Sequence, residues 1–141
     1  MKAILHTDGG ARGNPGPAGI GVVLEIGKEK KLFKKYIGEA TNNQAEYRAL
    51  ILGLEKAKEF GVEEIKCYLD SELVVKQLNR EYKVKDKGLA PLFVKIWNLA
   101  QGFKKISYKH IFREQNKLAD RLVNEAIDER VYLGIWNGDV E

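Results

Sequence analysis

Short apolar runs open the chain at residues 3–7, 20–26 and 31–37, and their length and bounding turn residues predict three strands. Residues 8–19 are rich in glycine and proline, which favours a turn-rich connection between the first two strands. A turn signal at 27–30 separates the second strand from the third. Because both links are short, we predict that these strands form an antiparallel meander.

The spacing of apolar residues changes to that of helices after residue 40. Helices are expected over 41–60, 71–78, 89–103 and 116–129, with strands over 64–69 and 105–111 between them. Strands that first follow one another and then alternate with helices predict an α/β fold. Its sheet should be mixed, with three antiparallel strands followed by parallel strands that helical crossovers join.

Composition narrows the class of protein. The 141 residues are 44% hydrophobic, which suits one domain with one core. Lys and Arg exceed Asp and Glu by 24 to 20, and this slight basic excess fits a polyanionic partner without requiring one. The single cysteine, Cys67, excludes an internal disulfide and a cysteine-based zinc site. The N-terminus lacks a signal-peptide core and no apolar stretch reaches roughly 18 residues, so we expect a cytoplasmic protein with no membrane partner.

Four acidic residues stand where a carboxylate is costly to bury. Asp8 is placed at the end of the first predicted strand and Asp70 directly after the fourth. Glu46 shares the inward face of its helix with apolar residues, and Asp120 lies beside the apolar stripe of the last helix. Each acid alone is explained as well by capping, ion pairing or solvation. Together they predict an oxygen-rich site for a hard cation, and two such ions roughly 3.5–4 Å apart would support phosphoryl transfer.

Four segments also carry a family resemblance. Residues 7–16, 41–46, 68–71 and 116–120 resemble, in the same order, the four motifs of type 1 ribonuclease H. A single Thr-Asp-Gly would say little, but four motifs in order on the expected strands and helices are specific. The resemblance implies a ribonuclease H-like fold with a five-stranded mixed sheet flanked by helices. It also implies a catalytic domain over 1–127, on which we expect the tail over 128–141 to pack.

The resemblance implies a magnesium site and a substrate site. Two Mg²⁺ ions, for which Mn²⁺ could substitute, would be held by Asp8, Glu46, Asp70 and Asp120. Nucleic acid would be contacted by Asn14, Asn42 and Asn43, and a DNA phosphate by Thr41. The residue types agree with this, because amides can reach 2′-hydroxyls and minor-groove base edges. Capping of the helix by Thr41 or Asn42 is compatible with the substrate role.

Other family features differ in this chain. The basic helical insertion that many members carry after the third motif is missing, because the loop before Gly88 is short. We also expect no hybrid-binding domain before Met1. The chain therefore resembles the compact form of the family. We expect the domain itself to bind substrate, with contacts from Lys83, Lys85 and Lys87.

The residue that assists the leaving oxygen has two candidates. The family often places a histidine on the loop before the last acid, but His110 falls in the strand predicted over 105–111. Arg113 fits that loop better, so we favour Arg113. An arginine there would stabilise phosphate charge and would not shuttle protons at neutral pH.

These inferences predict a monomeric endoribonuclease that hydrolyses the RNA strand of RNA–DNA hybrids by a two-metal-ion mechanism. It would leave 5′-phosphate and 3′-hydroxyl ends. The sequence does not decide whether double-stranded RNA is a further substrate. Two alternatives remain: the nuclease domain of a transposase or reverse-transcriptase-like ancestor, and a non-catalytic nucleic-acid-binding module. A missing acid would favour the second alternative, and all four acids are present.

Overall fold

The computed structural model describes residues 1–130. Its elements are β1 (Lys2–Ala11), β2 (Gly16–Ile26), β3 (Glu29–Ala40), α1 (Asn42–Glu59), β4 (Glu64–Leu69), α2 (Glu72–Leu78), α3 (Ala90–Ala100), β5 (Lys105–His110), the 3₁₀ turn η1 (Arg113–Gln115) and α4 (Lys117–Glu129). The predicted order of strands and helices is confirmed. The structure adds η1, which is too short for a periodic signal in the sequence to reveal it.

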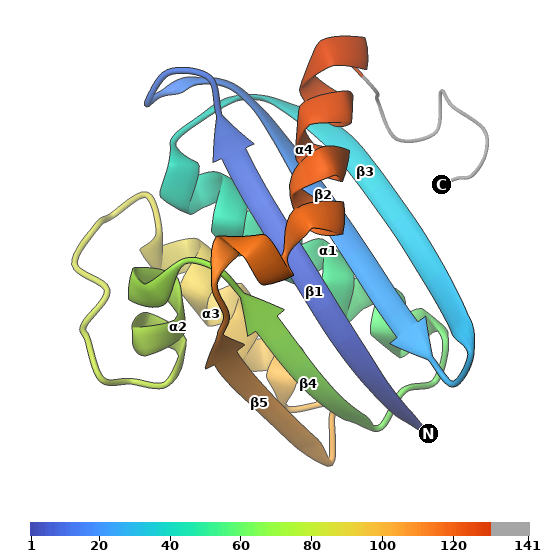
Figure 1. Ribbon diagram of the computed structural model, residues 1–141. Helices are drawn as coiled ribbons and strands as arrows, with labels where there is room; N and C mark the ends of the chain where they lie inside the picture. Colours follow the sequence, from blue (N-terminus) through green and yellow to red (C-terminus); the bar gives the residue numbers. More distant parts are fainter. Residues whose placement is uncertain (131–141) are drawn as a thin grey trace.

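The five strands form one mixed sheet in the order β3-β2-β1-β4-β5. β1 pairs antiparallel with β2, and β2 with β3, whereas β1 pairs parallel with β4, and β4 with β5. This topology confirms the predicted α/β fold. Figure 1 shows α1 behind the sheet and α4 crossing its front over β1 and β2. The main core includes the fully buried Leu5, Leu24, Leu50 and Leu54, from β1, β2 and α1.

The segment between the first two strands differs from the prediction. β1 continues through Asp8 to Ala11 and pairs with a β2 that begins at Gly16, so the prediction that Asp8 ends its strand is wrong. Glycines in this segment serve close packing. A Cβ at Gly9 would lie 2.2 Å from the main-chain carbonyl of Ala45, so only glycine lets α1 approach β1 this closely.

α4 approaches the other face of the sheet in the same way. A Cβ at Gly21, the residue paired with Asp8, would lie 2.4 Å from the carbonyl oxygen of Ala119 in α4. The two helices that carry Glu46 and Asp120 are therefore drawn against opposite faces of the strands around Asp8. The glycine-rich sequence thus brings the predicted acids toward one place.

The remaining segments define the limits of the domain. α4 runs to Glu129, and Arg130 closes it with a left-handed φ of 51°. The expected tail therefore begins inside α4, and its packing from residue 131 onward lies outside the described residues.

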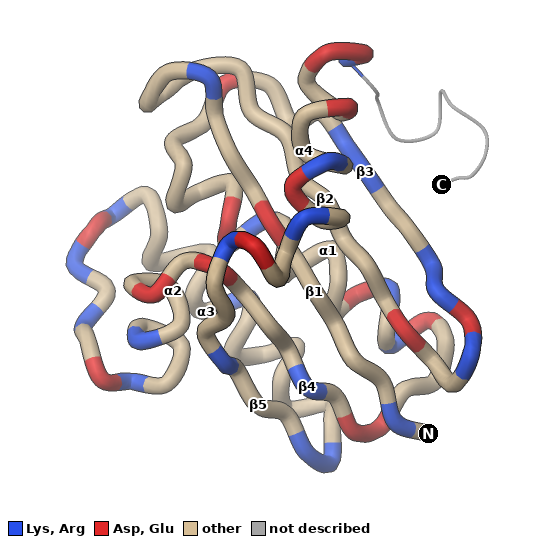
Figure 2. The backbone as a smooth tube through the Cα atoms, viewed as in Figure 1, with Lys and Arg blue, Asp and Glu red and all other residues tan. Residues whose placement is uncertain are grey.

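Between α2 and α3 the structure shows a loop without an inserted helix, and Figure 2 shows basic positions along it. In residues 1–130, no helix has the length and apolar character needed to cross a membrane.

Candidate active site

Three of the predicted acids meet at the centre of the molecule. Asp8 comes from β1, Glu46 from the first turns of α1, and Asp70 from the residue directly after β4. Each offers one carboxylate oxygen, and these oxygens all lie within 4.8 Å of one another. Asp8 and Glu46 are only 7% and 6% exposed. The buried Oε1 of Glu46 has no hydrogen-bond partner among the described residues.

This crowding changes the protonation of the acids. Burial, and then the charges of Asp70 and Asp120, raise the pKa of Asp8 to about 8. Burial, followed by the charges of Asp8 and Asp70, raises the pKa of Glu46 well above its usual value. A hydrogen bond from the Gly9 main chain favours both carboxylates but is outweighed. The cluster therefore takes up either protons or a cation near neutral pH. An unpartnered oxygen among several carboxylates suits a hard divalent ion.

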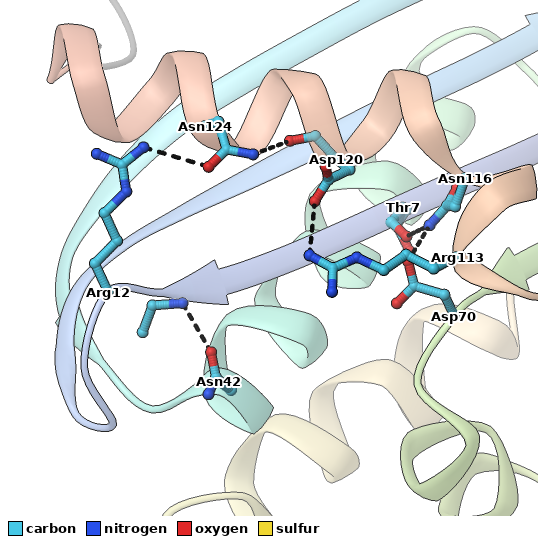
Figure 3. A network of polar contacts seen from close by, with 9 residues as sticks. Thr7, Arg12, Asn42, Asp70, Arg113, Asn116, Asp120 and Asn124 are labelled. Carbon is cyan, nitrogen blue, oxygen red and sulfur yellow. Dashed lines mark hydrogen bonds and ion pairs between the residues drawn. The ribbon is translucent and has the colours of Figure 1, made fainter.

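Asp120 lies at the rim of this cluster, in the first turn of α4. Its side chain is 34% exposed, and it lines the same cavity of about 390 Å³ as the other three acids. Arg113 also lines the cavity, with Nη2 3.7 Å from Asp120 Oδ1 (Figure 3). His110 lies in β5, as the sequence predicted, and is its last residue; its exposed ring makes a T-shaped contact with the ring of Phe112. Of the two candidates for the assisting role, only Arg113 lines the cavity.

The four predicted substrate-binding residues gather where α1 begins. Thr41 is the N-cap: its Oγ1 accepts from Gln44 N, and the Gln44 side chain accepts from Thr41 N, which forms a capping box. Asn42 Oδ1 accepts from the main-chain N–H of Ala11, and Asn14 Oδ1 accepts from that of Asn42, both at 2.9 Å. Asn42 lines the cavity, and Asn43 follows it half-buried in the first turn of α1. Thr41 therefore caps the helix, while Asn14 and Asn42 form hydrogen bonds that join the β1–β2 connection to the start of α1.

Sequence reasoning missed three residues that contact the site. Asn116 Nδ2 donates to Thr7 O and to Asp70 Oδ2, at 2.9 and 3.0 Å (Figure 3). Arg12 donates to Asn124, and Asn124 Nδ2 donates to Asp120 O at 3.1 Å. Residues 116, 120 and 124 follow one another at helical spacing, so they share one face of α4. That spacing was the available signal, but the sequence predicts Asn116 only as the first residue of the last helix and of the fourth motif. In the structure Asn116 is the N-cap of α4, and its side chain makes no capping bond.

Comparison with known proteins identifies relatives over most of the chain. A family model described as "Reverse transcriptase-like" matches residues 6–126. The bifunctional protein Rv2228c of Mycobacterium tuberculosis is 45% identical over 131 residues, which are 91% of this chain and 36% of that protein. Ribonuclease HI of Halobacterium salinarum is 45% identical over 126 residues, 88% of this chain and 63% of that protein. The chain thus spans about a third of the mycobacterial relative.

A solved structure agrees with these relatives. LC11-RNase H1 in complex with an RNA/DNA hybrid has a TM-score of 0.86 and 47% identity, and the match covers 91% of this chain and 98% of that one. A five-stranded mixed sheet with an acid cluster between its central strands and its helices defines the class as a ribonuclease H-like nuclease domain. The chain belongs to the ribonuclease H family, type 1, in the compact form whose α2–α3 connection carries no inserted helix in the described structure.

Proposed function

We propose that this chain is an endoribonuclease that hydrolyses the RNA strand of RNA–DNA hybrids and leaves 5′-phosphate and 3′-hydroxyl ends. The observation that carries the proposal is the cluster of Asp8, Glu46 and Asp70, whose oxygens lie within 4.8 Å of one another with one of them buried and unpartnered. The relation to LC11-RNase H1, which was solved with an RNA/DNA hybrid, supports the choice of substrate.

The proposed cofactor is a pair of Mg²⁺ ions, with Mn²⁺ as a substitute. Asp8, Glu46, Asp70 and Asp120 would hold them. Ions bound there supply Lewis acidity to the scissile phosphate and to the attacking water. Asp8 and Glu46 must first lose the protons that their raised pKa values retain, so binding of metal and release of protons are coupled. The side chain of Asp120 is 34% exposed, so it is closer to solvent than the buried Asp8 and Glu46.

Arg113 would stabilise negative charge in the reaction and would not transfer protons. Its guanidinium lies 3.7 Å from Asp120 at the rim of the cavity and is 80% exposed, so it is free to turn toward a bound phosphate. There it would stabilise the negative charge that develops on the leaving oxygen. Because an arginine stays protonated at any usable pH, it would not serve as general acid.

Substrate would extend from the acid cluster toward the start of α1. Asn14, Asn42 and Asn43 would contact the nucleic acid, and Thr41 a DNA phosphate. The loop between α2 and α3 passes this end of α1, because a Cβ at Gly88 would lie 3.0 Å from Nε2 of Gln44. The exposed lysines of that loop would then meet phosphates on the same side: Lys83, Lys85 and Lys87.

A cleavage assay tests the proposal directly. Labelled RNA–DNA hybrid, double-stranded RNA and double-stranded DNA are incubated with the chain and Mg²⁺, and product ends are read with a 5′-phosphate-dependent exonuclease. We expect cleavage of the RNA strand of the hybrid and none of the DNA duplex, and EDTA should stop the reaction. Binding of hybrid without cleavage would favour a non-catalytic module, and cleavage of the DNA duplex would favour a transposase-like nuclease.

The boundaries and assembly of this unit are part of the proposal. We assign the catalytic domain to residues 1–127 and regard the chain as a monomer. α4, which carries Asp120, extends two residues beyond that boundary to Glu129. A chain ending after α4 should therefore cut hybrid as the full chain does, and should elute as a single copy in size-exclusion chromatography with light scattering. Loss of folding in that shorter chain would contradict the boundary.

A further inference from the structure

Asn116 lies between η1 and α4, next to the acid cluster, and is only 2% exposed. Its Nδ2 donates to the carbonyl oxygen of Thr7 at 2.9 Å and to Oδ2 of Asp70 at 3.0 Å. An amide nitrogen carries two hydrogens, and these two acceptors use both. The donor end of Asn116 is therefore fully engaged by β1 and by one acid of the cluster (Figure 3).

The orientation of this amide has one physically sensible assignment. If the group were rotated by half a turn, Oδ1 would face Thr7 O and Asp70 Oδ2, and three acceptors would meet with no hydrogen between them. In the observed orientation Oδ1 is buried and has no hydrogen-bond partner within residues 1–130. A buried acceptor without a partner is costly. The two hydrogen bonds that Nδ2 donates therefore determine the orientation of this side chain.

Asn116 also connects the segments that carry the other acids. Its side chain holds the carbonyl of Thr7, the residue before Asp8, and its main-chain oxygen accepts from Asp120 N at 3.1 Å. One residue thus links β1, the end of β4 and the first turn of α4. These are the segments that carry Asp8, Asp70 and Asp120.

We propose that Asn116 is a positioning residue for the metal site: it fixes the Asp70 carboxylate through Oδ2 and so holds that acid at the distance from Asp8 and Glu46 that a shared cation requires. The inference rests on the proposed function only in that these acids bind a cation. A neutral donor suits this role. An ammonium or guanidinium at the same place would fix Asp70 equally well, but its charge would offset the negative charge that attracts the cation.

The test measures Mn²⁺ binding by titration calorimetry on the full chain without nucleic acid, so that cleavage does not enter. Asn116→Ala should raise the dissociation constant for Mn²⁺ by about ten-fold or more, the range found when a residue that orients a metal ligand is removed. Asn79→Ala is the matched control. Asn79 Nδ2 also donates to a main-chain oxygen, that of Tyr108, at 3.0 Å but away from the acids. Its Mn²⁺ affinity should stay within about two-fold of the native value.

Thermal unfolding of the same variants separates positioning from folding. Asn116→Ala should unfold at lower temperature, but binding is measured well below that transition, where the fold is intact by circular dichroism. If the alanine variant does not fold, Asn116→Leu, which keeps the branched shape of the side chain without the donor, takes its place. Saturating Mn²⁺ should return the turnover of the variant toward the native value, because a weakened site fills again at higher metal concentration, whereas a misfolded one does not.

The outcomes distinguish this inference from the proposed activity. Native Mn²⁺ affinity in a folded Asn116 variant overturns the positioning role, whatever the chain cuts. A native chain that binds Mn²⁺ and cuts no hybrid overturns the nuclease and leaves the positioning role standing. A native chain that binds no Mn²⁺ overturns both.

Discussion

Two groups of acids in this molecule bring carboxylates close together, and they differ in what balances the charge. On the side of α4 toward β3, Lys34 of β3 lies between Glu125 and Glu129, with Nζ 3.1 and 3.0 Å from their oxygens. Around Asp8, oxygens of three carboxylates lie within 4.8 Å of one another, but within residues 1–130 no basic side chain pairs with Asp8, Glu46 or Asp70. The first group contains its own cation, whereas the second needs one from outside the chain.

The pKa values show the same contrast. Burial lowers the pKa of Lys34, but hydrogen bonds and charge from Glu129 and Glu125 outweigh it and leave that pKa raised, so the pair favours the charged lysine. Burial and the neighbouring carboxylates instead raise the pKa of Asp8 to about 8, so its surroundings disfavour the charge that Asp8 carries as a ligand. Ion pairs that stabilise a fold satisfy their charges internally. A cluster that leaves them unsatisfied is typical of a functional site.

Neutralising one acid of the cluster of Asp8, Glu46 and Asp70, which has no basic partner among residues 1–130, should have the largest effect on activity. Asp70→Asn keeps the shape of the side chain but removes a ligand, and we expect turnover to fall on the order of 10³-fold or more, about 4 kcal/mol of transition-state stabilisation. Hybrid binding should persist, and stability should hold or rise because one repulsion is gone. Asp8→Asn and Glu46→Gln should behave alike. Single-turnover cleavage, fluorescence anisotropy and thermal unfolding measure the three quantities, and near-native turnover in Asp70→Asn would disprove the assignment.

The same cluster should make metal-free stability fall as pH rises. The pKa of Asp8 is about 8 in the fold, whereas an aspartate in the unfolded chain has a pKa of 3.8, so between these values the native state holds a proton that the unfolded chain has released. The stabilisation is complete below pH 4 and is lost through pH 8, at no more than about 1.4 kcal/mol per pH unit for one group. Urea unfolding in EDTA from pH 4.5 to 8.5 measures the slope. Asp8→Asn should flatten it, and an identical slope in that variant would refute this origin.

Arg113 should matter to turnover and His110 should not. Arg113 lines the cavity beside Asp120, whereas the exposed His110 contacts Phe112 at the end of β5. Arg113→Ala should slow turnover about ten-fold or more, equivalent to about 1.4 kcal/mol. His110→Ala should affect mainly stability, through the edge strand, and the pH–rate profile should keep its shape. A greater loss of turnover in a folded His110→Ala would reverse the assignment.

The sequence predicted the parts of the site that depend on local pattern. Short apolar runs and helical spacing predicted the order of elements, and an acid at an apolar position predicted Glu46, whose burial is visible in the pattern around it. The prediction that Asp8 ends its strand is wrong because the glycines after it continue β1 and allow close packing, and do not form a turn. The packing role of Gly9 and Gly21 depends on helices that arrive from far along the chain.

Contacts between residues far apart in the sequence could not be predicted from local pattern, for the same reason. Asn116 meets Thr7 across 109 positions, and Lys34 meets Glu125 across 91. No local periodicity reports either pair, since each depends on where α4 lies over the sheet. The four acids stand out in the sequence because each lies where a carboxylate is costly to bury. The resemblance of their motifs to a known family then supplied the long-range information that spacing lacks.

The smallest effect on stability is expected from Lys34, Glu125 and Glu129, which we call the balanced group because the lysine offsets the charge of the glutamates. Lys34→Met should leave Glu125 and Glu129 without their shared ammonium, but these glutamates are 36% and 50% exposed, so water and salt screen the repulsion that remains. The loss of stability should therefore be about 1 kcal/mol or less, and should shrink further in 1 M salt. Urea unfolding at low and high salt measures both values.

Lys34→Met also tests the contrast between the two groups, because Lys34 and its glutamates lie outside the cavity that the four acids line. Turnover and Mn²⁺ affinity should match those of the native chain, and saturating Mg²⁺ should raise the unfolding temperature of both by the same amount. Asp70→Asn should show the opposite pattern, with stability kept and the response to metal diminished. If Lys34→Met weakened Mn²⁺ binding, the balanced group would be coupled to the site through α4, and the division between structural and functional carboxylates would fail.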